Sequence, residues 1–470
     1  MMYIISFEIL LNIQSIFELP GSHPFFNIAV TIPIHIIFAP HKTGTMKVFK
    51  FGGASVDSVS RIHNLPGILQ HFESETLLIV ISAMGKTTNA LEKVAEAFFS
   101  GSQKKALDLF SDIKNQHLSL AETLDISDAS GLSQKLNDFF TEVEWLLHDK
   151  PVRPYNYYYD QIVCIGELLS TSILSSYLQK TGLSHQWVDV RDIFATDDQF
   201  RAASIDWEKT STRIRENIIP MLKDRRIILT QGFIGSTDAN ESTTLGREGS
   251  DYSAAIFANL LDADSLTIWK DVEGVMNADP KAFSDARYIR ELGYDEVIEM
   301  AFYGAQVIHP KTIKPLQNKD IPLYVKCFLD PSLPGTLIHS KHIHDLPPII
   351  VLKQNQVLMH FRSRDYSFVG EEGAARLYHL LSTLHIQANL LQTGAVILQV
   401  CADNIPDKIE NLALAASSFF DVQVEKDLTL LTIRHYQKDL LEKLIAGRKI
   451  ELQQWSPETV QTLLSSTLKD

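Results

Sequence analysis

The chain has 470 residues, of which 45% are hydrophobic and 21% are charged, an ordinary globular composition and a length that usually holds more than one domain. Lys and Arg number 43 against 57 Asp and Glu, so the formal net charge is −14. This balance argues against nucleic acid as the main partner, because phosphate backbones are bound through clustered positive charge, whereas a small anionic substrate is still compatible with it.

The first 45 residues are rich in Ile, Leu and Phe, but polar residues interrupt every run before it is long enough to span a bilayer. No Lys or Arg precedes Lys42, so the positive region of a secretory signal and the Arg-rich character of a transit peptide are missing. We therefore expect no membrane partner, and we interpret residues 1–45 as a non-native or disordered extension that precedes a natural start at Met46.

From Lys47 onward, short apolar runs alternate with helical stretches, which is typical of an α/β fold. Nearly all-apolar strands predict a mostly parallel sheet covered on both faces. Residues from about Lys104 to Leu147 show helical spacing and predict a helical insertion. The expected strands are Lys47–Phe51, Leu77–Ser82, Gln186–Val190, Arg226–Gln231, Ser265–Lys270 and Pro322–Lys326, and the expected helices are Val56–Gln70, Thr88–Phe99, Ile165–Gln179, Asp206–Ile219, Tyr252–Leu261 and Asp295–Ala305.

A polar stretch with paired prolines, Lys341–Pro348, predicts a linker. The order β-α-β-β-α-β beyond it predicts a ferredoxin-like module. Its expected elements are Val351–Phe361, Glu371–Leu384, Ala388–Gln392, Val396–Ala402, Ile405–Ser417 and Phe420–Lys426. A partial repeat should follow, with a strand Leu428–His435, a helix Lys438–Ala446, a strand Ile450–Gln453 and a final helix Pro457–Ser465. The predicted domains are thus residues 46–340, a linker 341–348, and residues 349–470 with one full and one truncated module.

Three cysteines, Cys164, Cys327 and Cys401, lie far apart and form no C-x-x-C pair. This pattern predicts neither a disulfide framework nor a zinc or redox site. A reducing cytoplasm is the simplest compartment for such a chain.

The motif K-F-G-G-A-S, Lys50 to Ser55, comes directly after the first strand. Two glycines at a strand end allow a sharp turn that brings backbone N–H groups close to a phosphate, and Lys50 can stabilise charge on a phosphoryl group in transfer. From this fragment alone a simple structural turn is the commoner explanation, because a Gly-Gly pair after a strand is more often just a turn.

A second motif, G-R-E-G-S-D, runs from Gly246 to Asp251 and leads into a helix. Ser250 and Asp251 are good N-cap residues, which is one sufficient reason for their presence. Arg247 in a glycine-flanked loop points to a ligand, because a guanidinium group matches a carboxylate bidentately.

Two further motifs, I-S-A-M-G-K-T-T-N from Ile81 and I-G-E-L-L-S from Ile165, place polar groups at a strand end and in an apolar helix. Ligands of open α/β sheets collect at the carboxyl ends of strands, so we expect the loops of K-F-G-G-A-S, G-R-E-G-S-D and I-S-A-M-G-K-T-T-N to face one crevice. Lys86 follows Gly85, but the spacing of a Walker loop is absent. A buried Glu167 needs a partner, and a substrate ammonium and a structural Arg are equally good candidates.

A fifth motif, W-K-D-V-E-G-V-M-N-A-D-P-K, spans Trp269 to Lys281. Asp271 at the end of its strand is placed to accept hydrogen bonds from a ribose or a base, although the motif alone is also a well-marked turn. His309, next to a proline, is interpreted as a helix cap rather than as a catalyst.

Together these fragments resemble the aspartate kinase branch of the amino-acid kinase family. K-F-G-G-A-S is similar to the family's usual K-F-G-G-T-S, and T-T-L-G-R-E-G-S-D-Y-S-A-A is similar to T-T-L-G-R-G-G-S-D-Y-T-A-A. Also similar are Q-G-F-I-G at Gln231–Gly235, V-D-V-R-D at Val188–Asp192 and F-Y-G-A-Q-V-I-H-P at Phe302–Pro310. The similarity runs in order from Met46 to about Ile338 and continues less clearly to the end.

The resemblance implies a three-layer αβα amino-acid kinase domain followed by ACT-type regulatory modules that pair in a homodimer. It implies transfer of the γ-phosphoryl group of ATP to the side-chain carboxylate of L-aspartate, which gives 4-phospho-L-aspartate, the first step towards lysine, threonine and methionine. Magnesium is expected to arrive with ATP rather than in a protein cage.

Carried over residue by residue, the resemblance makes Lys50 and Asp251 catalytic and assigns two sets of binding residues. The aspartate set is Ser82, Thr88, Glu167, Phe233 and Arg247. The nucleotide set is Lys50, Phe51, Gly52, Gly53, Ser250, Lys270, Asp271, Met276 and Lys281. In this assignment Arg247 clamps the α-carboxylate and Glu167 pairs with the α-ammonium.

This sequence departs from the family pattern at three places: Glu248 stands where Gly is common, Lys270 where Thr is common, and Gln306 where Lys is frequent. A kinase of the same fold for another substrate, such as glutamate or carbamate, and a catalytically silent amino-acid sensor are the alternatives. A fused homoserine dehydrogenase is not expected, because no G-x-G-x-x-G follows the kinase region.

In the regulatory region, the stretches that would bind an effector read S-F-V-G-E-E from Ser367 and L-Q-T-G-A-V from Leu391. The carboxylate expected after Thr393 is missing, and a buried ammonium without an anionic partner binds poorly. We therefore expect weak or absent inhibition by lysine and threonine, with the modules kept mainly for dimer contact.

Overall fold

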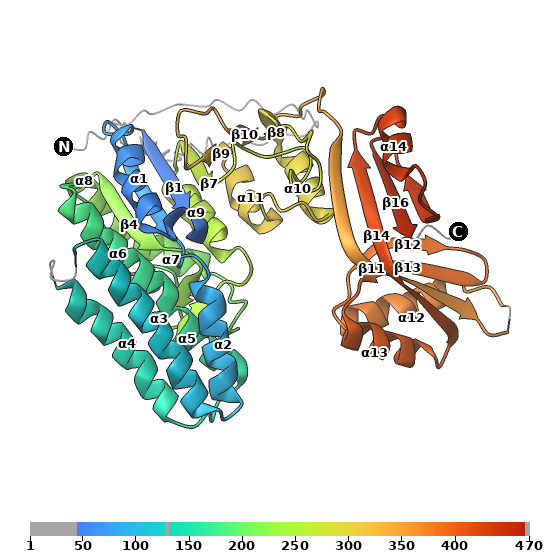
Figure 1. Ribbon diagram of the computed structural model, residues 1–470, viewed down its shortest axis with the longest axis horizontal. Helices are drawn as coiled ribbons and strands as arrows, with labels where there is room; N and C mark the ends of the chain where they lie inside the picture. Colours follow the sequence, from blue (N-terminus) through green and yellow to red (C-terminus); the bar gives the residue numbers. More distant parts are fainter. Residues whose placement is uncertain (1–44, 127–130, 366, 466–470) are drawn as a thin grey trace, which may run out of the picture. The chain divides into compact units, whose positions relative to one another are not determined.

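The computed structural model describes residues 45–126, 131–365 and 367–465 (Figure 1). The chain divides into two units, Met1–Gly44 and Thr45–Asp470. The predicted extension, residues 1–45, lies outside the described residues except for Thr45, so its interpretation stays a prediction.

An eight-stranded sheet forms the centre of the first part of the described chain. Its strand order is β3-β4-β2-β1-β7-β9-β10-β8, in which the strands from β3 to β9 are parallel, β10 is antiparallel to β9, and β8 is parallel to β10. Every residue of β4 is buried, which shows that helices cover both faces of the sheet. The bounds are β1 Met46–Phe51, β2 Thr76–Ile81, β3 Gln186–Val188, β4 Ile227–Gln231, β7 Ser265–Lys270, β8 Glu291–Gly293, β9 Leu323–Cys327 and β10 Thr336–His339.

Helix α6 packs against β2, β3 and β4, and helix α9 packs against β1, β2 and β7. With α5, α6 makes an apolar run, Tyr155–Lys180, that is long enough to cross a membrane, but 89% of its most apolar window is buried inside the protein. The helices are α1 Val59–Gln70, α2 Thr87–Phe99, α3 Gln103–Thr123, α4 Leu132–His148, α5 Tyr155–Val163, α6 Ile165–Lys180, α7 Trp207–Arg213, α8 Ile219–Asp224, α9 Gly249–Leu260, α10 Tyr294–Phe302 and α11 Pro310–Gln317.

The expected strands and helices of this part are confirmed, with small shifts at their ends, and the 104–147 insertion is helical as α3 and α4. The helix expected at Asp206–Ile219 is α7, which continues through a π-helical turn, Ile214–Ile218, into α8. Helices α5 and α11, strands β8 and β10, and the hairpin of β5 Ile234–Ser236 and β6 Ser242–Thr244 were not predicted from the sequence. Strands of three or four residues carry too few alternations to be recognised.

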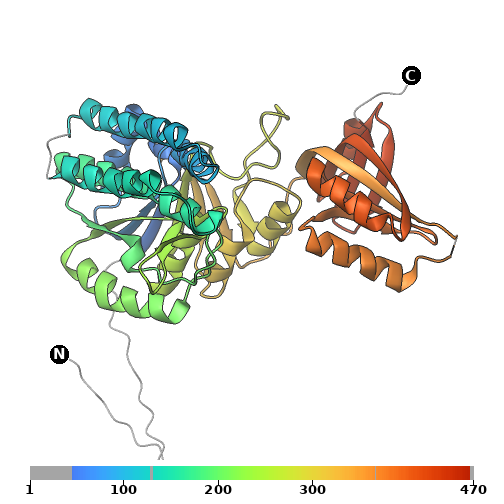
Figure 2. The same cartoon turned by 90° about the horizontal axis from the view of Figure 1, so that it is seen from below.

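The second part of the described chain forms a six-stranded antiparallel sheet with the order β12-β13-β11-β14-β16-β15. Side chains of α12 and α13 share one apolar core with this sheet, and both helices lie against it in Figures 1 and 2. The elements are β11 Ile349–Ser363, α12 Gly370–Thr383, β12 Ala388–Thr393, β13 Ile397–Asp403, α13 Pro406–Ala416, β14 Phe420–Arg434, α14 Lys438–Ile445, β15 Ile450–Trp455 and β16 Thr459–Ser465.

Two expectations for this region were wrong. The strands predicted at Phe420–Lys426 and Leu428–His435 are one 15-residue strand, β14, which pairs with β11 along its length. The final helix predicted at Pro457–Ser465 is strand β16, whose Val460, Leu463 and Leu464 are buried. A short apolar run does not distinguish a buried strand from a helix by periodicity.

The two sheets are linked by polar contacts as well as by the chain. Arg434 of β14 is buried and forms a bidentate ion pair with Glu296 of α10, with Nε to Oε1 and Nη2 to Oε2 both at 2.7 Å. His435 also contacts Glu296, with Nε2 to Oε2 at 3.0 Å. The backbone N–H of Ile350, at the start of β11, donates to the carbonyl of Asn277 at 2.7 Å. These contacts fasten β11 and β14 to the loop after β7 and to α10.

Candidate active site

The carboxyl ends of three central strands lie at the same level. Phe51 of β1 pairs with Ile81 of β2, and Ile81 pairs with Gln231 of β4. The loops that follow are bonded to each other, since Gly85 donates its N–H to the carbonyl of Gly53 at 3.0 Å. A cavity of about 240 Å³ lies at these strand ends.

Glycines allow these loops to approach one another closely. A Cβ atom on Gly53 would lie 2.5 Å from the carbonyl oxygen of Ala83, and one on Gly249 would lie 2.7 Å from Cδ2 of Phe233. A side chain at either position would collide with backbone or with a packed ring. The K-F-G-G and G-R-E-G-S-D motifs therefore need small residues for packing at the cavity, beyond the making of a turn.

Eight of the predicted site residues line this cavity. They are Lys50, Gly53, Ser82, Thr88, Glu167, Phe233, Ser250 and Asp251. The cavity is also lined by Ala83, Gly85, Glu248 and Gly249, none of which was predicted as a site residue. All four lie inside the quoted motifs, so the available signal was their position beside predicted residues at strand and helix ends.

Lys50 and Asp251 form an ion pair inside the cavity, with Nζ to Oδ1 at 2.7 Å. Their side chains are 13% and 7% exposed, so the pair is shielded from most solvent. Lys50 is the penultimate residue of β1 and Asp251 lies in the first turn of α9. The N-cap reading of Ser250 and Asp251 was wrong, because α9 begins at Gly249 and Glu248 occupies the capping position.

Glu167 is a buried carboxylate that faces the cavity from the first turn of α6. Its Oε1 accepts a long hydrogen bond from the Ala83 N–H at 3.4 Å, and its Oε2 has no hydrogen-bond partner in the described part of the chain. Burial raises the pKa of Glu167 to about 8, although the Ala83 N–H and the charge of Lys50 act against this shift. The structure thus pairs no Arg with Glu167, and the structural alternative for this residue was wrong.

Arg247 does not line the cavity but precedes Glu248, which does. Its side chain is exposed and makes no ion pair or hydrogen bond to any residue that the structure describes. Glu248 has a backbone φ of 54°, in the left-handed region that favours glycine. The departure from Gly at this position therefore places both backbone strain and an exposed carboxylate at the rim of the cavity.

The rest of the nucleotide set lies outside the cavity lining. Phe51 is buried and stacks on Trp269, with ring centroids 5.8 Å apart, and Gly52 is half-buried beside Lys50. Lys270 is held by a hydrogen bond from its Nζ to the carbonyl of Val307 at 2.7 Å. Beyond it, Asp271 and Lys281 are exposed and Met276 is half-buried, along the loop that follows β7. His309 caps α11, with Nδ1 accepting from the Lys311 N–H at 3.1 Å, as predicted.

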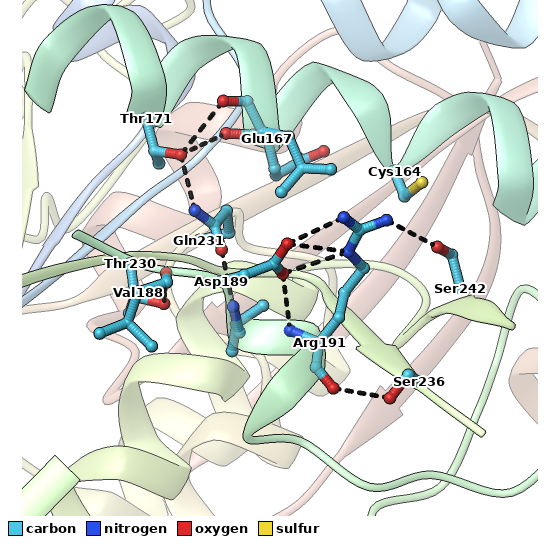
Figure 3. Close-up of polar contacts among 12 residues, drawn as sticks. Cys164, Glu167, Thr171, Val188, Asp189, Arg191, Thr230, Gln231, Ser236 and Ser242 are labelled. Carbon is cyan, nitrogen blue, oxygen red and sulfur yellow. Dashed lines mark hydrogen bonds and ion pairs between the residues drawn. The ribbon is translucent and has the colours of Figure 1, made fainter. Parts of the chain in front are cut away.

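A polar network joins the helix that carries Glu167 to neighbouring segments, and Figure 3 shows its contacts. Thr171 of α6 donates its hydroxyl to the carbonyl of Glu167 at 2.9 Å and accepts from Gln231 Nε2 at 2.7 Å. Gln231 Oε1 in turn accepts from the Val190 N–H at 2.8 Å. These contacts join the helix that carries Glu167 to the end of β4.

The same network reaches the β5–β6 hairpin. Arg191 pairs with Asp189 through Nη2 and Oδ2 at 2.8 Å and donates from Nη1 to Ser242 Oγ at 3.3 Å. The Ser236 hydroxyl donates to the Arg191 carbonyl at 2.6 Å. The motifs V-D-V-R-D and Q-G-F-I-G thus hold elements around the cavity in place.

An αβα fold with an ion-paired Lys, a buried carboxylate and glycine-bounded loops at neighbouring strand ends is typical of a small-molecule kinase. The model of the amino acid kinase family matches residues 45–327. The chain belongs to the amino acid kinase family.

The similar proteins place it among the aspartokinases. Lysine-sensitive aspartokinase 3 of Escherichia coli strain K12 is 30% identical over 397 residues, which cover 82% of this chain and 86% of that relative. Chloroplastic aspartokinase 1 of Arabidopsis thaliana is 30% identical over 421 residues, or 87% of this chain and 70% of the relative. The crystal structure of E. coli aspartokinase III with aspartate and ADP has a TM-score of 0.74 at 27% identity and covers 89% of this chain and 96% of that one.

Proposed function

We propose that this chain binds L-aspartate in the cavity at the ends of β1, β2 and β4 and phosphorylates its side-chain carboxylate with ATP, giving 4-phospho-L-aspartate. The observation that carries this assignment is the free Oε2 of buried Glu167, which faces a cavity that also holds the Lys50–Asp251 pair. An unpartnered buried carboxylate is costly, and a substrate ammonium would offset that cost.

In this mechanism Glu167 receives the α-ammonium and Arg247 receives the α-carboxylate. The two groups together distinguish a free α-amino acid from a simple dicarboxylate. Ser82, Thr88 and Phe233, which line the cavity, hold the side chain of the substrate. Because the β-carboxylate is already ionised at neutral pH, no general base is required.

Phosphoryl transfer depends mainly on positioning and on neutralising the equatorial oxygens of the phosphoryl group. Lys50 Nζ is the cation in the cavity, and Asp251 holds it 2.7 Å away. The N-terminus of α9 adds backbone N–H groups beside Ser250, where partial positive charge favours an anion. Magnesium bound to ATP would neutralise further phosphate charge, and the residues that the structure describes include no cluster of three His, Cys, Asp or Glu for a protein-bound ion.

The nucleotide is proposed to lie along the loop after β7, beside Phe51, Gly52, Lys270, Asp271, Met276 and Lys281. Lys270 and Lys281 bring positive charge to this otherwise acidic chain. A half-buried Met276 offers an adaptable apolar contact for the base.

A coupled assay of ADP release with magnesium tests the proposal. We expect turnover to depend on L-aspartate, and faster turnover with glutamate or carbamate would identify a different kinase of the same fold. Lys50→Ala should lower kcat, because it removes charge that meets the transition state, whereas Arg247→Ala should mainly raise the KM for aspartate, because it removes ground-state binding. Equal effects of both variants on both parameters would contradict these roles.

We also propose a cytoplasmic location and a homodimer formed through residues 349–470. The three cysteines are buried and free, as suits a reducing compartment. Light scattering on the full chain and on a chain ending at His339 would test the dimer, since loss of the 349–470 sheet should leave a monomer.

A further inference from the structure

Asp160 of α5 is a fully buried carboxylate that has no part in the proposed reaction. Its Oδ2 accepts the backbone N–H groups of Arg201 at 2.9 Å and of Thr244 at 2.8 Å, and its Oδ1 accepts the Thr244 hydroxyl at 2.7 Å. Charge-assisted hydrogen bonds of this length are the strong ones. A single side chain therefore binds two segments that are far apart in the sequence, one at Arg201 and one at Thr244.

The contacts of Asp160 fall directly before the loop that carries Arg247. Thr244 is the last residue of β6, and Arg247 follows three residues later. The neighbouring side chain, Gln161, binds the other end of β6. Its Oε1 accepts from the Ser242 N–H at 3.1 Å, and its Nε2 donates to the Ser242 carbonyl at 2.8 Å. Helix α5 thus fixes both ends of β6.

The segment at Arg201 packs against the loop that carries Arg247. Gly246 has a φ of 77°, and a Cβ atom there would lie 3.2 Å from the Arg201 carbonyl oxygen. The Ala203 N–H donates to the Thr244 carbonyl at 3.0 Å. Asp160 binds both Thr244, directly before the Arg247 loop, and the Arg201 segment that packs against this loop. Its carboxylate therefore fixes the position from which the Arg247 loop starts.

Helix α5 continues into α6 with Cys164 alone between them, and Cys164 has helical dihedral angles. Asp160 and Glu167 are seven residues apart along this run, which is about two turns, so both point from one side of it. The same helical segment therefore carries Glu167 and anchors the Arg247 loop.

We propose that Asp160 is a positioning residue that sets the Arg247 loop at a fixed separation from Glu167, and that this separation selects substrates with an α-ammonium and an α-carboxylate on one carbon. The inference rests on the proposed roles of Arg247 and Glu167. Because the contacts from α5 fix the position of β6, they also fix the distance between the charges of Arg247 and Glu167.

Steady-state kinetics of the full chain with Thr244→Val, Thr244→Ser and Asp160→Asn test this. Thr244→Val keeps the shape of the side chain but removes the hydroxyl donor, and Thr244→Ser restores it. Thr243→Val is the matched control, because it removes a buried hydroxyl contact of the adjacent residue, Thr243 Oγ1 to Thr196 Oγ1 at 2.7 Å, on the other side of β6.

We expect Thr244→Val and Asp160→Asn to raise the KM for aspartate by about tenfold or more, while the KM for ATP changes by less than about twofold. Thr244→Ser and Thr243→Val should keep the wild-type KM for aspartate. An unchanged KM in Thr244→Val, or an equal rise in Thr243→Val, would overturn the inference, because the second result would show general loosening of the hairpin. If Asp160→Asn does not fold, the three threonine variants decide.

Failure of the proposed function is a separate outcome. If the wild-type chain turns over a different α-amino acid, the same ratios are measured with that acid, because it carries the same two α-groups. If no acid is turned over, calorimetric Kd values for aspartate replace KM. Absence of aspartate binding to the wild-type chain would overturn both the function and the inference.

Discussion

The pH dependence of aspartate use is the most direct consequence of the buried Glu167. Its pKa is raised to about 8 by burial, so at neutral pH the free enzyme holds this carboxyl mostly as the neutral acid. A substrate ammonium needs the ionised form. The ionised fraction is about 1% at pH 6, about a tenth at pH 7 and one half at pH 8, and each pKa unit corresponds to about 1.4 kcal/mol.

We therefore expect kcat/KM for aspartate to rise about tenfold from pH 6 to 7 and about fivefold more from pH 7 to 8, since this parameter reports groups of the free enzyme. A Glu at its ordinary pKa would give a flat profile over the same range. Glu167→Gln should lower kcat/KM and abolish the slope, whereas Glu248→Gln, which removes the exposed carboxylate at the rim of the cavity, should keep the slope. A flat wild-type profile, or a slope that survives in Glu167→Gln, would refute this reasoning.

The same pKa has a consequence for stability. Because the folded-state pKa of Glu167 lies above that of an unfolded Glu, its contribution to stability is present below the unfolded value and is lost as pH rises through about 8. The Tm of Glu167→Gln relative to the wild type should therefore be higher at pH 9 than at pH 6. Calorimetric scans at both pH values measure this difference.

Four other outcomes follow. Glu248→Gly should lower the KM for aspartate a few-fold, because it removes a carboxylate at the rim of the cavity. It should also raise the free energy of unfolding by about 1 kcal/mol, because it removes a strained left-handed residue. An increased KM would show that Glu248 assists binding. Arg434→Met should cost about 3–5 kcal/mol of unfolding free energy, because it removes the bidentate partner of buried Glu296 and leaves that carboxylate only its contact with His435. Arg364→Met, which breaks an exposed pair with Asp421, should cost under about 1 kcal/mol in the same denaturant titration. Lysine and threonine titrated into the activity assay should give no half-inhibition below about a millimolar, and submillimolar inhibition by either would mean that an effector site is present. A chain that starts at Met46 should match the full chain in activity, because β1 is held at its first residue by the Met46 N–H, which donates to Asp264 Oδ2 at 2.6 Å. A clear loss of activity would make residues 1–45 part of the functional protein.

The sequence predicted the longer elements, in which buried residues give a recognisable hydrophobic pattern. It did not predict several short strands, which are defined mainly by pairing with a neighbouring strand. Strands β1 and β7 are six-residue segments that are mostly buried, and their predicted bounds are nearly correct. Strands β6 and β10 are three and four residues long, which is too short for an alternating pattern to reveal them. Helix α5 is a run of aromatic residues without a clear helical period, and it was missed for that reason.

The candidate site shows the same division. Lys50, Glu167 and Asp251 were identified from local motifs, and the structure brings them to one cavity. Glu167 is buried, and no Arg of the described residues bonds its Oε2, because of how α6 packs against the loop after β2, which local sequence does not reveal. Asp160 was missed because its partners, Arg201 and Thr244, are 41 and 84 residues away along the chain.

The contacts between the two sheets bear on how residues 349–470 influence the reaction. The loop after β7 contributes Asn277, which is bonded to Ile350 of β11 and directly follows Met276 of the nucleotide set. Gly304, in the segment after α10, packs against Lys353 of β11, and Lys270 is held by the carbonyl of Val307 in that same segment. Arg434 of β14 forms its ion pair with Glu296 of α10. Each of these contacts therefore falls on segments that flank the proposed nucleotide site, whereas the loops that line the aspartate cavity are held by α5, α6 and α9. A rearrangement of the 349–470 sheet would thus act first on ATP binding, and its kinetic signature would be a change in the KM for ATP rather than in the KM for aspartate.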